Sequence, residues 1–278
     1  MEVIETIAAF RQARARFGQL GLVPTMGYLH EGHLSLVRHA RRECGAVAVT
    51  IFVNPTQFSP SEDLARYPRD LPRDLRMLAD EQVDLVFVPS VAEMYPPGFS
   101  TVVDVRGVTA MLEGAVRPTH FQGVATVVCK LLNIAQATRA YFGQKDAQQT
   151  VVVRNMARDL DIPTEIVVSP TVREPDGLAM SSRNVYLNPA ERQAATALHR
   201  ALRVAQERFN AGEHSGEILR STMRQILDAE PLAQIEYVSA ADPLTLQELD
   251  EVGANGALLS LAVRFGKTRL IDNVLLGM

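Results

Sequence analysis

Two histidines, His30 and His33, lie three residues apart with Gly32 between them. They follow the apolar run 20–23 and a turn at 24–27, where a helix is expected to begin. Backbone N–H groups at a helix start attract anions, and a histidine N–H can donate to a phosphate oxygen. The alternative is that one histidine caps the helix and the other lies on the surface. Their position after a strand favours a phosphate site. A zinc-protease motif does not fit, because it needs histidines four apart.

A second polar turn, Gly143-Gln144-Lys145-Asp146, follows the strand-like run 139–142. A lysine ammonium can reach a phosphate, and Asp146 can cap the next helix or orient a ribose hydroxyl. Taken by itself, Asp146 is more simply interpreted as a helix cap.

Two further groups of polar residues complete the candidates. The loop 176–184 carries Ser181, Ser182 and Arg183, which suit a triphosphate, although a solvated turn is the alternative. Gln57 and Gln149 offer neutral amides, which suit a hydroxyl or a carboxylate without strong charge attraction. For either glutamine taken alone, an ordinary surface position is the better interpretation.

The elements that must position these residues alternate between strand and helix. Strands are expected at 20–23, 46–53, 83–88, 139–142 and 164–168, with helices at about 32–44, 68–82, 121–135 and 146–161. This alternation predicts an α/β fold with a Rossmann-like parallel sheet flanked by helices. Polar candidates follow the ends of several strands, and ligands of such sheets bind at the carboxyl ends, so the pattern predicts one active site.

From about residue 189 the pattern changes. One long amphipathic helix is expected at 189–211, a second at 215–228, and short strands near 235–239, 257–262 and 269–272. We therefore expect two domains, a nucleotide-binding domain at 1–171 and a smaller α/β lid domain at 172–278. The stretch from Pro170 to Gly177 is a candidate hinge.

The composition excludes several classes of protein. The net charge is −4 and basic and aromatic residues are not interleaved, so neither nucleic acid nor a membrane surface is an expected partner. The two cysteines, Cys44 and Cys129, lie far apart, which fits a reducing, cytoplasmic compartment. No signal peptide or membrane-spanning run is visible.

Five sequence blocks, in order, resemble the pantothenate synthetase (pantoate–β-alanine ligase) family of the nucleotidylyltransferase superfamily. His30-Glu31-Gly32-His33 is similar to the His-x-Gly-His signature of the superfamily, and Met180-Ser181-Ser182-Arg183 is similar to its second phosphate-binding signature. The other three blocks are 52–58, 117–121 and 142–149.

The resemblance implies an enzyme that joins (R)-pantoate to β-alanine, converting ATP to AMP and pyrophosphate through a pantoyl adenylate. It also implies a homodimer and the use of Mg²⁺. His30, His33 and Lys145 would be catalytic, with His33 the proton donor, and Gln57 and Gln149 would hold pantoate, with Gln57 also serving β-alanine. The residues implied to bind ATP are Met26, Gly27, Tyr28, Leu29, His30, Glu31, Gly32, His33, Gly143, Gln144, Lys145, Asp146, Val172, Met180, Ser181, Ser182 and Arg183.

One position departs from the family pattern. Arg73 stands where members often carry an acidic residue associated with the metal, and a guanidinium does not bind Mg²⁺. Asp74 or the triphosphate alone remain the alternatives, so the metal ligands stay unassigned.

Two rival functions remain open. One is a nucleotidylyltransferase that keeps the nucleotide as its product, although Gln57, Gln149 and a second domain of this size would then have no purpose. The other is a nucleotide-sensing or RNA-binding module on the same fold, against which the net charge argues.

Overall fold

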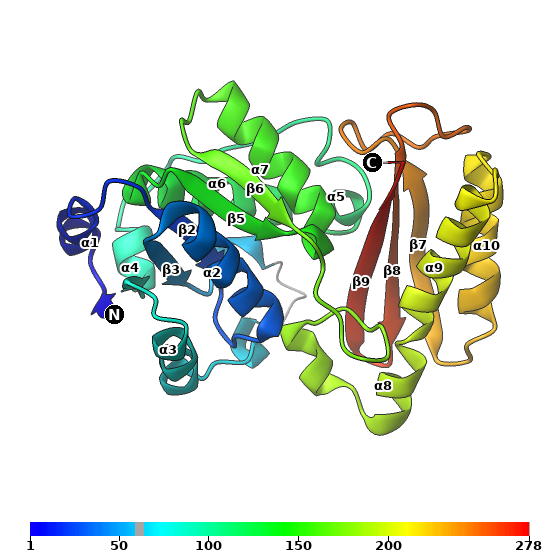
Figure 1. The fold of residues 1–278 in the computed structure, drawn as a ribbon, viewed down its shortest axis with the longest axis horizontal. Coiled ribbons are helices and arrows are strands. Elements are labelled where there is room, and N and C mark those ends of the chain that lie inside the picture. The colour runs from blue at the N-terminus through cyan, green and yellow to red at the C-terminus, as the bar shows by residue number, and fades with distance from the viewer. Residues whose placement is uncertain (59–63, 278) are drawn as a thin grey trace. The chain divides into compact units, whose positions relative to one another are not determined.

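A computed structural model describes residues 1–58 and 64–277 of the chain. The described residues divide into two compact units. The first comprises Met1–Gly143 and Gln149–Pro170, and the second comprises Gln144–Gln148 and Thr171–Met278. Figure 1 shows the helices and strands of both units.

The first unit is built on a six-stranded sheet in the order β1-β4-β3-β2-β5-β6, and every pairing in it is parallel. The parallel sheet predicted from the sequence is confirmed. The strands are β1 (Glu2–Ile4), β2 (Gly21–Thr25), β3 (Val47–Ile51), β4 (Leu85–Phe87), β5 (Arg139–Gly143) and β6 (Glu165–Ser169).

The strand order reverses between β2 and β5. The chain builds outward from β2 through β3 to β4 on one side, and from β5 to β6 on the other. In open α/β sheets a crevice forms at the carboxyl ends of the strands where the order reverses. The first candidate motif leaves the end of β2 and the second leaves the end of β5, so both begin at this switch point.

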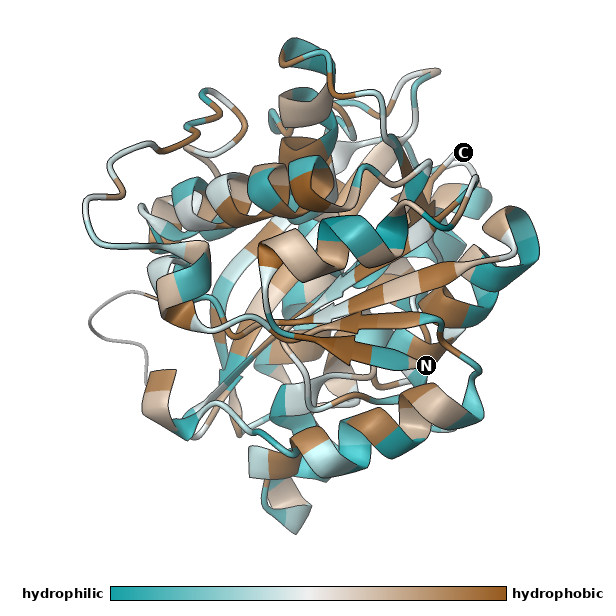
Figure 2. Ribbon diagram, turned by 90° about the vertical axis from the view of Figure 1, so that its left-hand side faces the viewer, coloured by the Kyte–Doolittle hydropathy of each residue, from teal (hydrophilic) through white to brown (hydrophobic). Residues whose placement is uncertain are grey.

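The helices of the first unit cover both faces of its sheet. Apolar side chains of β2 and β3, such as Val23 and Val49, pack with Val37 of α2 and Leu78 of α3. In Figure 2 the helices are banded in apolar and polar colours, as expected for amphipathic helices that cover a sheet. The helices are α1 (Ile7–Arg14), α2 (Glu31–Cys44), α3 (Leu71–Asp80), α4 (Val91–Met94), α5 (Glu113–Val116), α6 (His120–Ala135) and α7 (Ala147–Asp159), with short 3-10 turns η1 (Pro55–Gln57) and η2 (Leu64–Arg66). Two more 3-10 turns, η3 (Gln144–Asp146) and η4 (Ser182–Tyr186), belong to the second unit.

The second unit is a three-stranded antiparallel sheet with helices on one face. Its strands β7 (Ala233–Ala241), β8 (Ala257–Phe265) and β9 (Thr268–Leu276) are nine residues each, longer than predicted. Leu202 of α9 (Ala197–Asn210) and Met223 of α10 (Gly216–Asp228) pack with Leu259 and Leu261 of β8.

The single helix predicted over 189–211 is wrong. The chain instead forms α8 (Pro189–Ala194) and α9, separated by Ala195 and Thr196. At the break the backbone bonds span three residues, from Thr196 to Gln193 and from Leu198 to Ala195, and the Thr196 hydroxyl also donates to the Gln193 carbonyl at 2.8 Å. Local bonds of this kind compete with the four-residue bonds of an α-helix.

Candidate active site

The turn between β2 and α2 adopts a conformation that most residues avoid. Gly27 has φ +80° and the next residue, Tyr28, has φ +51°. A Cβ at Gly27 would also lie 3.0 Å from Ile51 Cγ2 and 3.1 Å from Asp74 Oδ2, so glycine is required on two grounds. A left-handed non-glycine residue costs on the order of 1–3 kcal/mol. This backbone must therefore be held in place by its surroundings.

The two histidines of the motif define the start of α2. His30 is the N-cap, and its backbone N–H donates to Nδ1 of His33 at 3.3 Å. The imidazole centroids lie 4.1 Å apart. Because Nδ1 of His33 accepts a hydrogen bond, the proton of the neutral ring resides on Nε2. His33 thus presents a donor nitrogen at a helix N-terminus, the arrangement expected of a phosphate ligand or proton donor.

A buried carboxylate, Asp74, lies beside this turn. It belongs to the first turn of α3 and is 1% exposed. Its Oδ2 accepts from the Tyr28 N–H at 2.7 Å and its Oδ1 accepts from the Leu29 N–H at 2.8 Å. Burial raises the pKa of Asp74 above its usual range. The sequence indicated Asp74 only as an alternative metal ligand and gave no sign of these contacts.

The neighbouring Arg73 contacts the same turn. Its guanidinium donates to the Leu29 carbonyl at 3.0 Å and lies 5.4 Å from the centre of the Tyr28 ring. It also lies 3.6 Å from an oxygen of Asp74. Arg73, which departs from the family pattern, therefore acts on the backbone of the histidine motif.

Gln57 is buried in the 3-10 turn η1, which follows β3 along the chain. Its side-chain oxygen accepts from Asn54 Nδ2 at 3.1 Å, and its Nε2 lies 3.1 Å from the sulfur of Met26. The same Asn54 amide donates to the Gly123 carbonyl in α6 at 3.1 Å. The surface position considered for Gln57 is therefore wrong, and its amide lies against the start of the histidine motif.

Lys145 lies in a turn that belongs to the second unit, although it directly follows β5. Asn273 of β9 holds this turn, because its Nδ2 donates to the carbonyls of Gln144 at 3.0 Å and of Lys145 at 2.8 Å. Its Oδ1 accepts from the side chain of Gln144 at 3.0 Å. The Lys145 ammonium lies 3.4 Å from Asp146. No signal in the sequence indicated Asn273, because it lies within a strand of mixed polar and apolar residues and belongs to no recognised motif.

The loop that begins the second unit is closed on itself. The N–H of Met180 donates to the carbonyl of Val172 at 3.0 Å, so these two predicted ATP residues are adjacent. Arg173 forms a two-pronged ion pair with the buried Asp272 at 2.6 and 2.9 Å. The loop is therefore fastened to β9, which leaves less of the stretch 170–177 free to act as a hinge.

The Ser181–Arg183 segment follows this loop as an ordered turn. The Ser181 hydroxyl accepts from the N–H of Arg183 at 3.2 Å and caps η4. The segment is half-buried rather than fully solvated. A local backbone role for Ser181 therefore accompanies any contact with phosphate.

The predicted residues thus fall into two groups. The first unit contains Met26 to His33, Gln57, Gly143 and Gln149, and the second contains Gln144 to Asp146, Val172 and Met180 to Arg183. Within each unit the structure brings residues together, as Met26 with Gln57 and Val172 with Met180. The convergence of both groups on one triphosphate stays a prediction.

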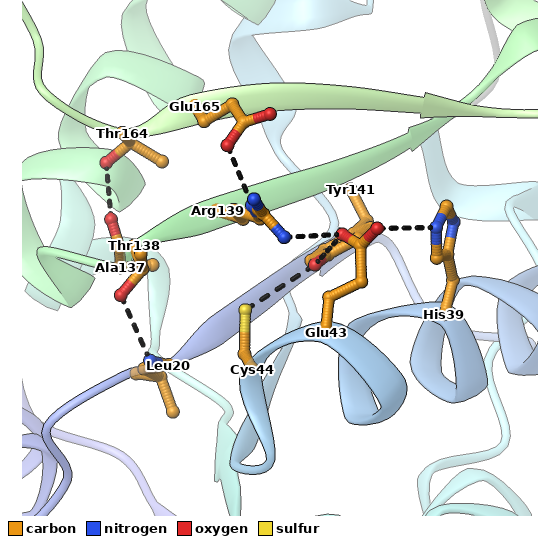
Figure 3. Close-up of polar contacts among 10 residues, drawn as sticks. All are labelled: Leu20, His39, Glu43, Cys44, Ala137, Thr138, Arg139, Tyr141, Thr164 and Glu165. Atoms are coloured by element: carbon orange, nitrogen blue, oxygen red, sulfur yellow. Dashed lines mark hydrogen bonds and ion pairs between the residues drawn. The ribbon is translucent and has the colours of Figure 1, made fainter.

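A polar network anchors α2 away from its histidine end. Figure 3 shows the Tyr141 hydroxyl of β5 between Glu43 and Cys44 of α2. It donates to Glu43 at 2.7 Å and lies 3.5 Å from the Cys44 sulfur, and Arg139 reaches the same carboxylate at 3.1 Å. Burial, with the neighbouring Cys44 and Glu43, raises the pKa of Tyr141, so its hydroxyl keeps its proton. The network fixes α2 to the sheet.

The described residues form no metal centre from protein side chains alone. Among residues 1–58 and 64–277, no three His, Cys, Asp or Glu side chains gather as a metal-binding group. Both Asp74 oxygens already accept backbone N–H groups, and Arg73 carries a positive charge. The positive charge of Arg73, 3.6 Å from Asp74, therefore disfavours a Mg²⁺ ion at this carboxylate, and no protein ligand for Mg²⁺ is assigned.

Neither cysteine in the described residues forms a disulfide, and no helix there is long and apolar enough to span a bilayer.

The family model for pantoate-beta-alanine ligase matches residues 2–275. A pantothenate synthetase of Chloroflexus aurantiacus is 68% identical over 276 residues, covering 99% of this chain and 98% of the relative. One from Roseiflexus castenholzii is 68% identical over 277 residues, with 99% of each chain covered.

Solved structures are similar over almost the whole chain. A crystal structure of pantothenate synthetase from Thermus thermophilus has a TM-score of 0.95 at 51% identity, with 99% of each chain covered. The pantoate-beta-alanine ligase from Francisella tularensis, complexed with beta-gamma ATP and beta-alanine, has a TM-score of 0.80 at 35% identity, covering 99% of this chain and 97% of that one.

Proposed function

The chain belongs to the pantoate–β-alanine ligase family, whose members join pantoate to β-alanine at the expense of ATP, and we propose that it does so in two steps through a pantoyl adenylate. In the first step a pantoate carboxylate oxygen attacks the α-phosphorus of ATP, and the bond to the β-phosphate breaks to release pyrophosphate. In the second, the amine of β-alanine attacks the acyl carbon, AMP leaves, and the amine gives up a proton to solvent. The product is pantothenate.

The observation that carries this proposal is the geometry at the switch point. The N-terminus of α2, with His33 presenting its Nε2–H, directly follows β2, and the Lys145 turn directly follows the neighbouring β5. The first step needs positive groups for the departing pyrophosphate and little covalent work from the protein. Lys145 supplies a positive charge, and His30 and His33 supply ring N–H groups that can donate to phosphate oxygens, with His33 as the proposed proton donor. Met180 to Arg183 with Val172 would complete the ATP site.

Gln57 and Gln149 would hold pantoate. The buried amide of Gln57 is oriented by Asn54, so it can offer hydrogen bonds to a hydroxyl or carboxylate of the substrate. A site with oriented polar groups discriminates strongly against a substrate that leaves them unpaired. Pantoate without its 2-hydroxyl is therefore expected to be a poor substrate.

Pantoate-dependent exchange of labelled pyrophosphate into ATP tests the adenylate step. We expect exchange with pantoate alone and pantothenate only when β-alanine is added. His33→Ala should lower the exchange rate by about 10²–10⁴-fold, the usual effect of losing a positioned acid or an electrostatic group. Gln57→Ala should raise the KM for pantoate far more than the KM for ATP. Exchange that proceeds equally without pantoate would contradict the proposal and favour a nucleotidylyltransferase.

We also propose that residues 172–278 form a lid over a nucleotide-binding domain at 1–171. An acyl adenylate hydrolyses if water reaches it, so closing the site after ATP and pantoate bind would preserve it. Phosphate ligands carried on the lid would couple closing to the triphosphate. ATP with pantoate should then slow amide exchange at 176–186, and Arg183→Ala should weaken this protection. Equal protection without ligands would mean that the segment is a fixed wall.

The remaining properties follow from the family resemblance and the chemistry. Mg²⁺ would enter with ATP, held by the phosphate oxygens, because the described side chains beside the histidine motif do not form a site for it. A homodimer in the cytoplasm, where thiols such as Cys44 stay reduced, is the assembly and location that we propose. Light scattering of the purified protein measures the assembly directly.

A further inference from the structure

Two residues in the first turn of α3, Arg73 and Asp74, hydrogen-bond the backbone of Tyr28 and Leu29. We call this set of hydrogen bonds the Asp74 clamp. The carboxylate of Asp74 accepts the N–H of Tyr28 at 2.7 Å through one oxygen and the N–H of Leu29 at 2.8 Å through the other. Arg73 donates to the Leu29 carbonyl at 3.0 Å. Both polar backbone groups of Leu29 are thus bound by adjacent residues of one helix.

The Asp74 clamp holds the residues of the motif whose backbone is strained. Tyr28 is in the left-handed region, where a residue with a side chain is strained, and Gly27 before it also has positive φ. Leu29 is followed at once by His30, the N-cap of α2. The path of these residues decides where α2 begins and hence where the His30 and His33 rings lie.

The helix α3, which carries Arg73 and Asp74, is held in place by its N-cap and by its packing in the core. Asp70 caps α3, accepting the Arg73 N–H at 3.0 Å, and Leu78 of the same helix is fully buried in the core of the first unit. Asp74 is buried at the site of the clamp, and ionised carboxylates are costly to bury. A buried carboxylate whose two oxygens both accept hydrogen bonds makes the surrounding backbone rigid.

We propose that Asp74 is a positioning residue that holds the His30–His33 motif in the conformation needed to form the adenylate. Arg73 assists it by binding the Leu29 carbonyl. This inference rests on the proposed function for the role of the histidines. In this proposal Asp74 holds the backbone of Tyr28 and Leu29, and Mg²⁺ is bound by the phosphates of ATP. Arg73 has a structural task that explains a guanidinium at this position.

The central test compares Asp74→Asn with Asp70→Asn. An asparagine at 74 has nearly the same shape but only one accepting oxygen, so its NH₂ group faces one of the two backbone N–H groups. Asp70→Asn changes a carboxylate one turn earlier on the same helix and does not touch the loop. It is the matched control for the loss of a carboxylate charge at the start of α3, because asparagine caps a helix about as well as aspartate.

Two measurements separate loop positioning from general destabilisation. Pantoate-dependent pyrophosphate exchange should fall by about 10–10²-fold in Asp74→Asn, the scale of a misplaced catalytic group, and by less than twofold in Asp70→Asn. The reaction of β-alanine with chemically prepared pantoyl adenylate should change less than exchange does. Arg73→Met, which keeps an apolar stem without the guanidinium, should show a smaller fall than Asp74→Asn.

A readout independent of activity keeps this inference distinct from the proposed function. Amide exchange at Tyr28 and Leu29 should become at least tenfold faster in Asp74→Asn, and exchange in the core strand β3 should not. If Asp74→Asn leaves the exchange of these two amides unchanged, Asp74 does not hold the turn and the proposal is wrong, whatever the activity of the variant. Equal losses of pyrophosphate exchange in Asp74→Asn and Asp70→Asn would also overturn it. If the wild-type protein shows no pantoate-dependent exchange while the loop amides still respond, the proposed function has failed and the clamp has not.

Discussion

Replacing Gly123 by alanine sets two physical effects against each other. Gly123 lies in the interior of α6, where alanine is a better helix former by about 1 kcal/mol. A Cβ at this position would, however, lie 2.4 Å from the Thr56 carbonyl oxygen, 2.6 Å from its carbon and 2.7 Å from the Gln57 nitrogen. All three atoms belong to the backbone of η1, so no side-chain rotation relieves the contact.

The size of the effect follows from these distances. Ordinary van der Waals contact begins near 3.4 Å, so η1 and α6 must separate by about 1 Å. Overpacking of this kind costs about 1–3 kcal/mol, which outweighs the gain in helix propensity. The shift displaces Gln57 and stretches the bonds that Asn54 makes to Gln57 and to the Gly123 carbonyl. A misplacement of about 1 Å can lower a catalytic rate by about 10²-fold.

The assay is pantoate-dependent pyrophosphate exchange combined with thermal unfolding. We expect Gly123→Ala to lower kcat/KM for pantoate by about 10–10²-fold, to leave the KM for ATP nearly unchanged, and to lower Tm. Gly18→Ala is the matched control, because its backbone φ is not positive and a Cβ there meets nothing within 4 Å. If Gly123→Ala raises Tm and leaves the pantoate kinetics intact, the close approach does not constrain Gln57 and the reasoning is wrong.

Three further predictions follow from the contacts described above. Asn273→Ala removes the two bonds that hold the backbone of the Lys145 turn, so the KM for ATP should rise about tenfold with the pantoate KM little changed; a normal ATP KM in steady-state assays would show that the turn holds itself. Tyr141→Phe removes the hydroxyl between Glu43 and Cys44 and should lower Tm by about 2–4 °C in scanning fluorimetry while the exchange rate stays within twofold, and a large loss of activity would place this network in the site. Burial raises the pKa of Asp74 above its ordinary 3.8, so the folded protein takes up this proton at a higher pH than the unfolded chain. Ionisation of Asp74 therefore lowers the free energy of unfolding as the pH rises from 3.8 through the folded pKa. The hydrogen bonds to Tyr28 and Leu29 nevertheless need the ionised carboxylate, because both of its oxygens accept. The charged neighbours of Asp74 are Arg73 and Asp70. On acidification, the rate of pyrophosphate exchange should begin to fall at a higher pH than the pKa of an ordinary aspartate. Asp74→Asn should lack this acidic limb of the pH–rate profile.

The fold could be predicted where one physical signal dominated. The strands β2, β3 and β5 are short, largely buried apolar runs, and Gly27, Pro55 and Gly143 mark where they end, so their type and approximate bounds followed from the sequence. The break between α8 and α9 could not be predicted, because its sequence, Ala195 and Thr196, contains neither glycine nor proline. The hydroxyl of Thr196 and the packing of the second core decide it.

The sequence carried a signal for part of the candidate site. His30, His33 and Lys145 follow strand ends, as expected from the sequence, and their roles stay predictions. Asp74 and Asn273 escaped prediction because each acts on a loop far away in sequence, 45 and 128 residues distant. A polar residue inside an amphipathic helix or an apolar strand resembles any surface residue until the folded chain shows what it contacts.

The segment Gln144–Gln148 belongs to the compact unit formed by Thr171 onward, although both its flanks belong to the other unit. A chimaeric enzyme made by joining two relatives at residue 171 would therefore inherit this segment from the wrong parent. Its Gln144 and Lys145 carbonyls would meet an Asn273 that evolved with a different turn. Recombination that respects the structure needs three crossovers, after 143, after 148 and after 170. The second unit is thus not a cassette that can be exchanged with a single cut.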